Sequence, residues 1–321
     1  MSITADDVRW CYRNLLGREP ESSIIVAAHA AADDDILSLI HRFITSPEYL
    51  MKRGDSPPSR VPFDAPAMDI ELDASPEQMA RMWAGICSAW TRLGEVRPHH
   101  SVLTEERYLP GKFNQEAEAQ FWDSGVAEAA IVHRILQRYD FNNTTSKTCV
   151  EYGSGVGRVT CGFAKLFSTV HGYDISPTHL NLARTHASTL GIDNILFHLC
   201  SNEAGPQSLQ KCDFFYSKIV LQHNPPPLIR VLVREAFNSL LPGGIAIFQV
   251  PTYGIGYSFK IEYYFSQEVN NDLEMHCIPQ PEIFSLIAET GCRLLGVRED
   301  ESIGRQGQWI SDVFIVERPL L

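Results

Sequence analysis

The sequence has 321 residues, a formal net charge of −12 at pH 7 and an isoelectric point near 5.4. This length accommodates two domains, and the acidic charge argues against a nucleic-acid polyanion as the main substrate. No apolar run reaches the ~18 residues that a membrane span needs, and the acids near the N-terminus argue against a signal peptide.

The eight cysteines are scattered and include no C-x-x-C pair. Several fall in predicted strands or helices, where we interpret them as small buried apolar side chains. Neither a disulfide framework nor a zinc site is therefore predicted, and this fits a reducing cytoplasm.

The first part of the chain, residues 1–54, predicts a small helical module. Apolar side chains between Val8 and Leu16 recur at helical spacing, and Gly17-Arg-Glu-Pro20 ends that helix. Two further helices are expected over 21–32 and 33–46. Residues 55–75 contain several prolines without sustained periodicity, so we expect a semi-rigid linker and the domain boundary there.

The next stretch predicts helices with a polar segment between them. One helix is expected from Pro76 to about Leu93, and it is followed by an irregular segment that contains His99 and His100. A second helical stretch spans 114–139, and we expect a break in it near Gly125.

The centre of the sequence is Val150-Glu-Tyr-Gly-Ser-Gly-Val-Gly-Arg158, an apolar run followed by glycines at alternate positions. A strand, a glycine turn and a helix present a ligand at the carboxyl ends of a parallel sheet, and Gly153 and Gly155 let the backbone approach that ligand. A dinucleotide fingerprint would need glycine where Arg158 stands. Glu151 instead suits a ligand with an ammonium group and no pyrophosphate.

The next predicted strand ends at Asp174, 17 residues after Gly157. An acid at the end of this second strand can accept hydrogen bonds from both hydroxyls of a ribose. Ammonium and ribose without phosphate predict S-adenosylmethionine as the ligand.

With these motifs, residues 146–321 resemble the class I S-adenosylmethionine-dependent methyltransferases. Gly172-Tyr-Asp-Ile-Ser-Pro177 matches the second motif, Asp213–His223 the fourth strand and Leu240–Phe248 the turn into the fifth. The resemblance implies an α/β fold, a Rossmann-like sheet of seven strands that is mostly parallel with its last strand antiparallel. The strands are expected near 148–152, 169–173, 195–199, 212–217, 244–250, 292–298 and 312–317.

Two N-terminal segments carry further resemblances. Tyr12–Pro20 and Phe43–Tyr49 are similar to a small helical domain of unknown function that is often appended to bacterial enzymes of surface-glycan assembly. This resemblance implies a packing or docking module, and residues 1–54 could then bind a protein partner. Trp90–Val102 resembles the segment before the core of methyltransferases that modify bacterial glycans and sugars. A methyltransferase domain over 76–321 would then use residues 76–145 as a helical cover.

The class I resemblance also assigns roles in the cofactor site. Glu151 would bind the ammonium group, Asp174 the ribose and Ile175 the adenine, while Arg158 would bind the cofactor carboxylate or pair with an acid. The family usually has Asp and a small residue after the third strand, whereas this chain has Ser201 and Asn202 there. The expected cofactor-binding residues are Glu151, Gly153, Ser154, Gly155, Gly157, Arg158, Asp174, Ile175, Ser201, Asn202 and Ser217.

Methyl transfer from a sulfonium needs alignment and, for a hydroxyl acceptor, a base. His223 is the leading catalytic candidate, because Asn224-Pro-Pro-Pro227 turns the chain away at the end of its strand. His276 is the second candidate. Aromatic residues within 251–273 predict a lid or a sugar-stacking wall, with ordinary loop packing as the alternative. No metal is expected, since only Asp213 lies near the fourth strand.

The sequence thus predicts a cytoplasmic bacterial methyltransferase that acts on a hydroxyl or amine of a saccharide, in a surface glycan or its activated precursor. One alternative keeps methyl transfer but has a natural product or another small molecule as the acceptor. The other is a non-catalytic, cofactor-binding assembly subunit that acts through residues 1–54. No nucleic acid is expected as a partner.

Overall fold

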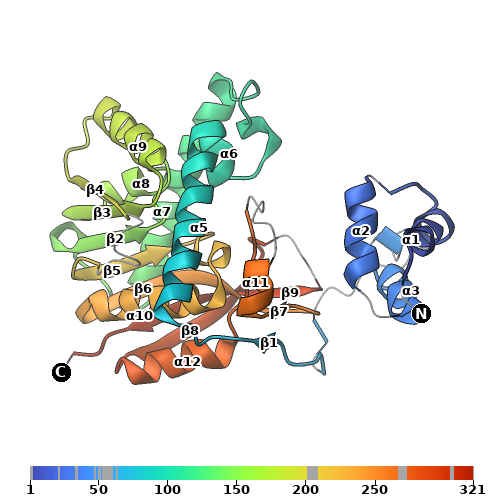
Figure 1. Ribbon diagram of the computed structural model, residues 1–321. Coiled ribbons are helices and arrows are strands. Elements are labelled where there is room, and N and C mark those ends of the chain that lie inside the picture. Colours follow the sequence, from blue (N-terminus) through green and yellow to red (C-terminus); the bar gives the residue numbers. More distant parts are fainter. Residues whose placement is uncertain are drawn as a thin grey trace. The chain divides into compact units, whose positions relative to one another are not determined.

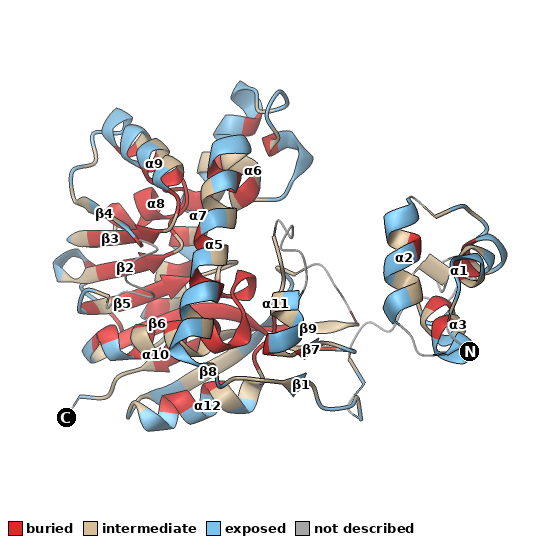
Figure 2. Cartoon of the chain, in the orientation of Figure 1, coloured by how far each residue is buried: buried red, intermediate tan, exposed pale blue. Residues whose placement is uncertain are grey.

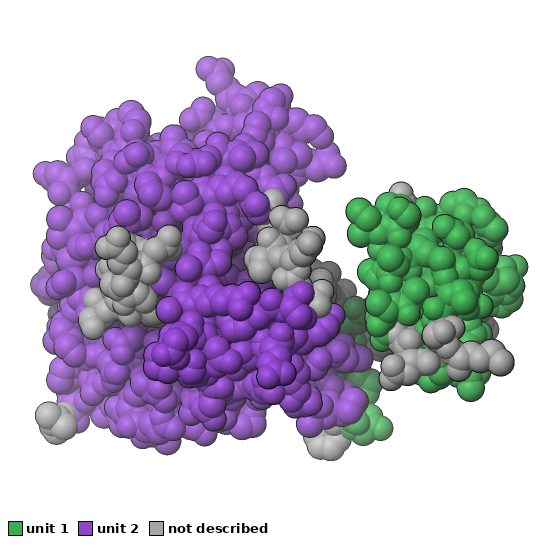
Figure 3. Space-filling model, viewed as in Figure 1, with its two compact units in different colours: residues 1–64, 306–308 green, residues 65–305, 309–321 purple. Residues whose placement is uncertain are grey.

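The computed structural model describes residues 3–20, 22–32, 35–46, 48–49, 52, 61–62, 64–200, 209–266, 273–303 and 307–320. The chain divides into two compact units, residues 1–64 with 306–308 and residues 65–305 with 309–321 (Figure 3). Part of the predicted linker, residues 55–60 and 63, lies outside the described residues.

The smaller unit is built from short helices around one apolar cluster. Thr4 and Asp7 form reciprocal hydrogen bonds that cap the first helix. Gly17, with φ of 63°, ends the segment that continues it. The cluster includes Val8, Cys11, Tyr12, Leu39 and Phe43. The elements are α1 (Ala5–Cys11), the π-helical η1 (Tyr12–Leu16), α2 (Ser23–Ala32) and α3 (Ile36–Ile44).

The larger unit contains a seven-stranded sheet in the order β4-β3-β2-β5-β6-β9-β8 (Figure 1). All pairings are parallel except those of β9, which is antiparallel to both of its neighbours. This confirms the predicted sheet, including the insertion of the last strand. The strands are β2 (Thr148–Tyr152), β3 (Thr169–Asp174), β4 (Ile195–Leu199), β5 (Cys212–Ser217), β6 (Leu240–Gly254), β8 (Arg293–Asp300) and β9 (Trp309–Glu317).

The larger unit also contains a small parallel pair of strands and most of the helices. The pair is β1 (Asp69–Ile70) with β7 (Ser258–Phe259). The helices are α5 (Pro76–Val96), α6 (Pro98–Val102), η2 (Glu106–Tyr108), α7 (Gln115–Gln137), η3 (Thr144–Ser146), α8 (Thr160–Ala164), α9 (Pro177–Thr189), η4 (Leu221–His223), α10 (Pro226–Ser239), α11 (Ile261–Ser266) and α12 (Gln280–Glu289).

Successive side chains of the strands point to opposite faces of the sheet, and each face has its own cluster. Val150 and Phe215 pack with α5, α10 and α12, whereas their neighbours Cys149 and Phe214 pack with α7 and α8. The central strands are therefore buried on both sides (Figure 2). Such a core explains why these strands are near-continuous apolar runs.

The break expected near Gly125 is wrong, because α7 runs unbroken from Gln115 to Gln137. A Cβ at Gly125 would overlap the backbone carbonyl of Arg158. Glycine at this position lets α7 approach the turn after β2 and does not end the helix.

In the described parts of the chain, we find no helix with the length and apolar character to cross a bilayer.

Candidate functional site

A cavity lies where the parallel strands β2, β3 and β5 end. Its lining includes 153–155 after β2, 174–175 after β3 and 218–220 after β5, and Trp90 of α5 contributes to the wall. The cavity encloses about 870 Å³, part of it open to solvent, which is a usual size for a small-molecule site. In the sheet, β3 and β5 lie on either side of β2, and the strand order reverses between β2 and β5. The cavity is therefore at the edge of the sheet where ligands usually bind in such folds.

The glycine turn after β2 forms one wall of the cavity, and its glycines are required because there is no room for side chains. Gly153 and Gly155 have φ of 80° and 53°, values that glycine adopts without strain. A Cβ on Gly153 would overlap Val220, and a Cβ on Gly155 would lie 2.8 Å from Val102. Gly157 also has a positive φ, but it packs against Ala183 and does not line the cavity.

Glu151 is a buried acid in the cavity wall. Thr160 donates a hydrogen bond of 2.5 Å to its carboxylate. Burial raises the pKa of Glu151 to about 8, although the bond from Thr160 and the charge of Arg158 act in the opposite direction. A positively charged ligand would stabilise the ionised carboxylate of Glu151, so this buried acid favours a cationic group in the cavity.

Asp174 is held rigidly at the end of β3. Its Oδ2 accepts from the backbone N–H of Gly155 and its Oδ1 from that of Ser176, each at 2.8 Å. The Nδ1 of His179 lies 3.5 Å from Oδ1, and the Nε2 of His179 lies 3.0 Å from the Oγ of Ser101 in α6. The acid is thus fixed by the glycine turn and linked to the helical cover.

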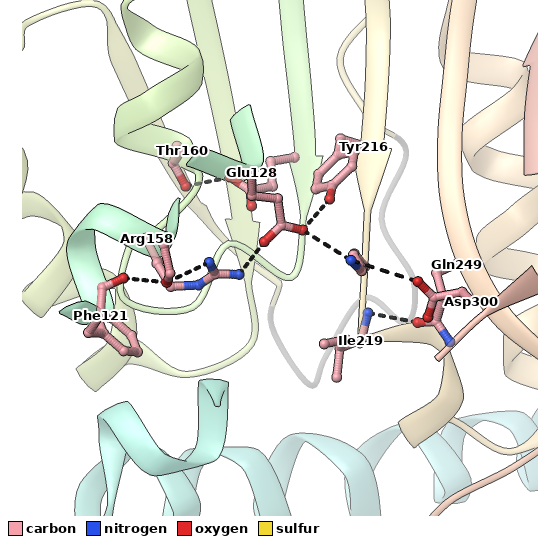
Figure 4. Close-up of polar contacts among 11 residues, drawn as sticks. Phe121, Glu128, Arg158, Thr160, Tyr216, Ile219, Gln249 and Asp300 are labelled. Atoms are coloured by element: carbon pink, nitrogen blue, oxygen red, sulfur yellow. Dashed lines mark hydrogen bonds and ion pairs between the residues drawn. The ribbon is translucent and has the colours of Figure 1, made fainter. Parts of the chain in front are cut away.

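Three polar atoms of cavity-lining residues are buried and have no hydrogen-bond partner among the described residues. They are Ser154 Oγ, Arg158 Nε and the Nδ1 of His179, which lies 3.5 Å from Asp174. Arg158 uses its other nitrogens, since Nη1 donates to Ser124 at 3.1 Å and Nη2 to Glu128 at 2.6 Å (Figure 4). Arg158 therefore pairs with an acid, one of the two roles expected for it, and keeps Nε–H for a ligand.

Glu128 was not predicted as a site residue, yet it lies at the centre of this cluster (Figure 4). Tyr216 donates to it at 2.5 Å, and Lys218 Nζ lies 3.7 Å from its carboxylate and 3.8 Å from that of Asp300. Burial opposes ionisation of Glu128, but Arg158 and Lys218 outweigh it and its pKa is lowered. The one signal in the sequence was its spacing of four residues from Ser124, which places both on one face of α7.

Residues 149–244 match the model of a protein family described as a methyltransferase domain. The chain therefore contains an S-adenosylmethionine-dependent methyltransferase domain. Its seven-stranded sheet, with the inserted antiparallel strand, has the arrangement expected for class I methyltransferases. A comparison with curated proteins found no match.

Solved structures of several methyltransferases are similar to this one. Magnesium protoporphyrin IX methyltransferase of Synechocystis PCC 6803 with bound S-adenosylmethionine is 14% identical, with a TM-score of 0.49, over 77% of this chain and 99% of that one. Geranyl diphosphate C-methyltransferase of Streptomyces coelicolor A3(2) is also 14% identical, with a TM-score of 0.46, over 64% of this chain and 85% of that one.

The cavity of this methyltransferase fits the groups of its cofactor. A buried acid at Glu151 suits an ammonium group, and the free hydrogen-bonding atoms of Ser154 and Arg158 suit a carboxylate. Asp174 is fixed where hydroxyls can reach it, and Ile175 beside it adds an apolar surface.

Not every expected cofactor residue reaches the cavity. Ser217 instead donates from its Oγ to the backbone carbonyl of Tyr152 at 2.9 Å and joins β5 to β2. Ser201 and Asn202 lie outside the described residues. Cys200, immediately before them, does line the cavity.

A second cavity adjoins the first and contains His223. It spans about 1,050 Å³, part of it open to solvent, and the two cavities share Ser101, Val102 and Ile219. Nδ1 of His223 lies 2.8 Å from the carbonyl oxygen of Glu274. Burial lowers the pKa of His223 to about 4, so its imidazole is neutral at pH 7.

His276 lines neither cavity. Its Nδ1 lies 2.8 Å from the hydroxyl of Tyr257 and its Nε2 3.5 Å from the carboxylate of Glu274. Phe259 and Tyr264 also pack around it, as in the packing alternative for this aromatic segment. Within the aromatic segment 251–273, residues 267–272 lie outside the described part of the chain.

The two histidines of the polar segment before the core, His99 and His100, also line neither cavity. His99 stacks on Phe113 at 4.1 Å between ring centroids and meets Phe121 edge-on. His99 belongs to a small aromatic cluster between α6 and α7 that also includes Tyr108. We therefore assign His99 a packing role.

Proposed function

We propose that this methyltransferase transfers a methyl group to a hydroxyl, or to an amine, of a saccharide in a surface glycan or its activated precursor, with His223 as the base. The observation that carries the proposal is the second cavity. It adjoins the cofactor cavity through Ser101, Val102 and Ile219, and it presents a buried neutral imidazole.

The lining of this acceptor cavity favours a neutral ligand rich in hydroxyls. Ser101, Thr104 and Gln222 offer uncharged polar groups, while Leu103 and Ile303 add apolar surface. Among its described lining residues, Glu105 is the one charged side chain, so no cation is available there for a phosphate group. This lining supports a sugar ring as the ligand, and we propose that any nucleotide or lipid carrier would lie outside the cavity.

In the cofactor cavity, S-adenosylmethionine supplies a methyl group already activated on a sulfonium. Ionised Glu151 would bind its ammonium group, and Ser154 and Arg158 Nε its carboxylate. Asp174 would accept hydrogen bonds from the ribose hydroxyls, and Ile175 would pack on the adenine, with Ser201 and Asn202 proposed for the adenine amine. Gly153 and Gly155 would leave room for the methionine end.

His223 would take the proton of the acceptor hydroxyl as the new bond to carbon forms. A sugar hydroxyl is almost wholly protonated at pH 7, so a nearby base lowers the barrier. An amine acceptor need only be bound neutral and depends less on this residue. The smaller unit supports a glycan acceptor only by its resemblance to modules of glycan-assembly enzymes.

The first experiment is calorimetric titration of wild type and Asp174→Ala with S-adenosylhomocysteine. We expect micromolar binding that weakens at least tenfold in the variant, about 1.4 kcal/mol. A screen of nucleotide sugars and free saccharides then follows, with His223→Asn as the matched variant. It should bind the cofactor as wild type does and lose transfer to hydroxyls; full activity of His223→Asn would contradict its role. Tight cofactor binding without transfer to any acceptor would favour the assembly subunit.

A further inference from the structure

Ile219 adopts a backbone conformation that is rare for its side chain. Its φ is 57°, in the left-handed region that β-branched residues avoid. It lies two residues after the end of β5 and lines both cavities, so it forms part of the wall between them. Its backbone N–H donates to Oε1 of Gln249 at 2.9 Å (Figure 4).

That bond fixes the orientation of the Gln249 side-chain amide. A backbone N–H can only donate, so the end of Gln249 that meets Ile219 is the oxygen. Its Nε2 then donates to Oε1 of Gln222 at 3.0 Å and to Oγ of Ser311 at 2.6 Å. Gln249, Gln222 and Ser311 are all buried, so these groups have no access to bulk water as a replacement.

The orientation of Gln222 is fixed in turn. Its oxygen faces Gln249, so its Nε2 faces the ring of His223, 3.3 Å from Nε2 of the imidazole. An amide nitrogen only donates, and therefore Nε2 of His223 accepts. At the other side of the ring, Nδ1 lies 2.8 Å from the carbonyl oxygen of Glu274, which only accepts. Both ends of the chain require the proton on Nδ1.

We infer that Gln249 is a positioning residue that holds His223 in the Nδ1–H tautomer, through Gln222, while it anchors the wall at Ile219. Gln249 lies in β6 and lines neither cavity, so it acts on the reaction through other residues. The lone pair of His223 stays on Nε2, where an acceptor hydroxyl would replace the Gln222 amide before it gives up its proton. This inference rests on the proposed role of His223 as the base.

The test is a ¹H–¹⁵N correlation spectrum of the histidine rings in the free protein, with the signals of His223 assigned by their loss in His223→Asn. In the wild type we expect a protonated Nδ1 and an unprotonated Nε2. Gln249→Met has a similar length but releases the Gln222 amide, so the Nε2 shift should differ from that of the wild type. Ser311→Ala removes a bond of Gln249 that does not lead to His223, and its spectrum should match the wild type.

Transfer to a hydroxyl acceptor provides the second readout. We expect kcat to fall about tenfold in Gln249→Met, with a smaller effect on KM and none of this loss in Ser311→Ala. A wild-type proton on Nε2, or identical His223 shifts in wild type and Gln249→Met, would overturn the inference. If the shifts move as expected while His223→Asn keeps full activity, the proposed base fails and the assignment of the tautomer stands.

Discussion

Arg158 and Glu128 form a largely buried ion pair, with 2.6 Å between Nη2 and Oε2, across the contact between α7 and the turn after β2. Gly125 of the same helix packs on the carbonyl of Arg158, so backbone and side chain are held together. The pair joins the helical cover to the cofactor cavity at the point where Arg158 keeps its Nε free. Glu128 is therefore the residue of α7 on which the geometry of this wall depends.

Removing Glu128 should destabilise the enzyme strongly. Glu128→Ala leaves Arg158 buried without its carboxylate and takes an acceptor from Tyr216, and breaking such a pair costs about 3–5 kcal/mol. Glu118→Ala, at an exposed position of the same helix, should change the unfolding free energy by less than about 0.5 kcal/mol. Urea denaturation measures both, and equal losses in the two variants would refute the structural role of the pair.

A side chain on Gly153 should block cofactor binding. Gly153→Ala combines a left-handed backbone with overlap against Val220 in the cavity wall, so we expect S-adenosylhomocysteine to bind at least tenfold more weakly. Gly256→Ala is the control, because Gly256 has φ of 68° but no neighbouring atom near an added Cβ.

The control variant should lose about 1–2 kcal/mol of stability from strain alone and bind the ligand as wild type does. Calorimetric titration and urea denaturation of both variants separate strain from lost space. Unchanged affinity in Gly153→Ala would show that the turn does not shape the ligand site.

The sheet could be predicted from the sequence because each of its strands is marked by residues next to one another in the chain. Each strand is a short apolar run before a turn, and the glycine motif after β2 and the acid ending β3 stand at strand ends that meet at one edge. Glu151 and Asp174 were placed in this way, and both line the cavity.

Contacts between distant elements could not be predicted. Glu128 meets Lys218, and Gln249 meets Ser311, across separations that carry no local pattern. His276 illustrates the same limit. Its backbone N–H donates to the carbonyl of Gln222, beside His223, but its side chain packs against Tyr257 and does not line the cavity that contains His223.

Cofactor binding should release a proton from Glu151. In the free protein its pKa is about 8, so the carboxyl is mostly protonated at pH 6.5, and a bound ammonium group would favour the ionised form. Affinity should therefore rise with pH from 6 toward 8. Titrations at pH 6.5 in buffers of different ionisation enthalpy measure the proton released, and Glu151→Gln reports the contribution of all other groups.

The same pKa predicts the stability of the free enzyme. The folded pKa of Glu151 lies above the ordinary value of 4.5, so its contribution is fully present below pH 4.5 and is lost as the pH rises through about 8. Glu151→Gln should remove that loss, and urea denaturation at pH 6 and pH 9 with and without ligand measures it. In the titrations of proton release, equal values for wild type and Glu151→Gln would contradict binding of the ammonium group by Glu151, because the two proteins differ only at this side chain.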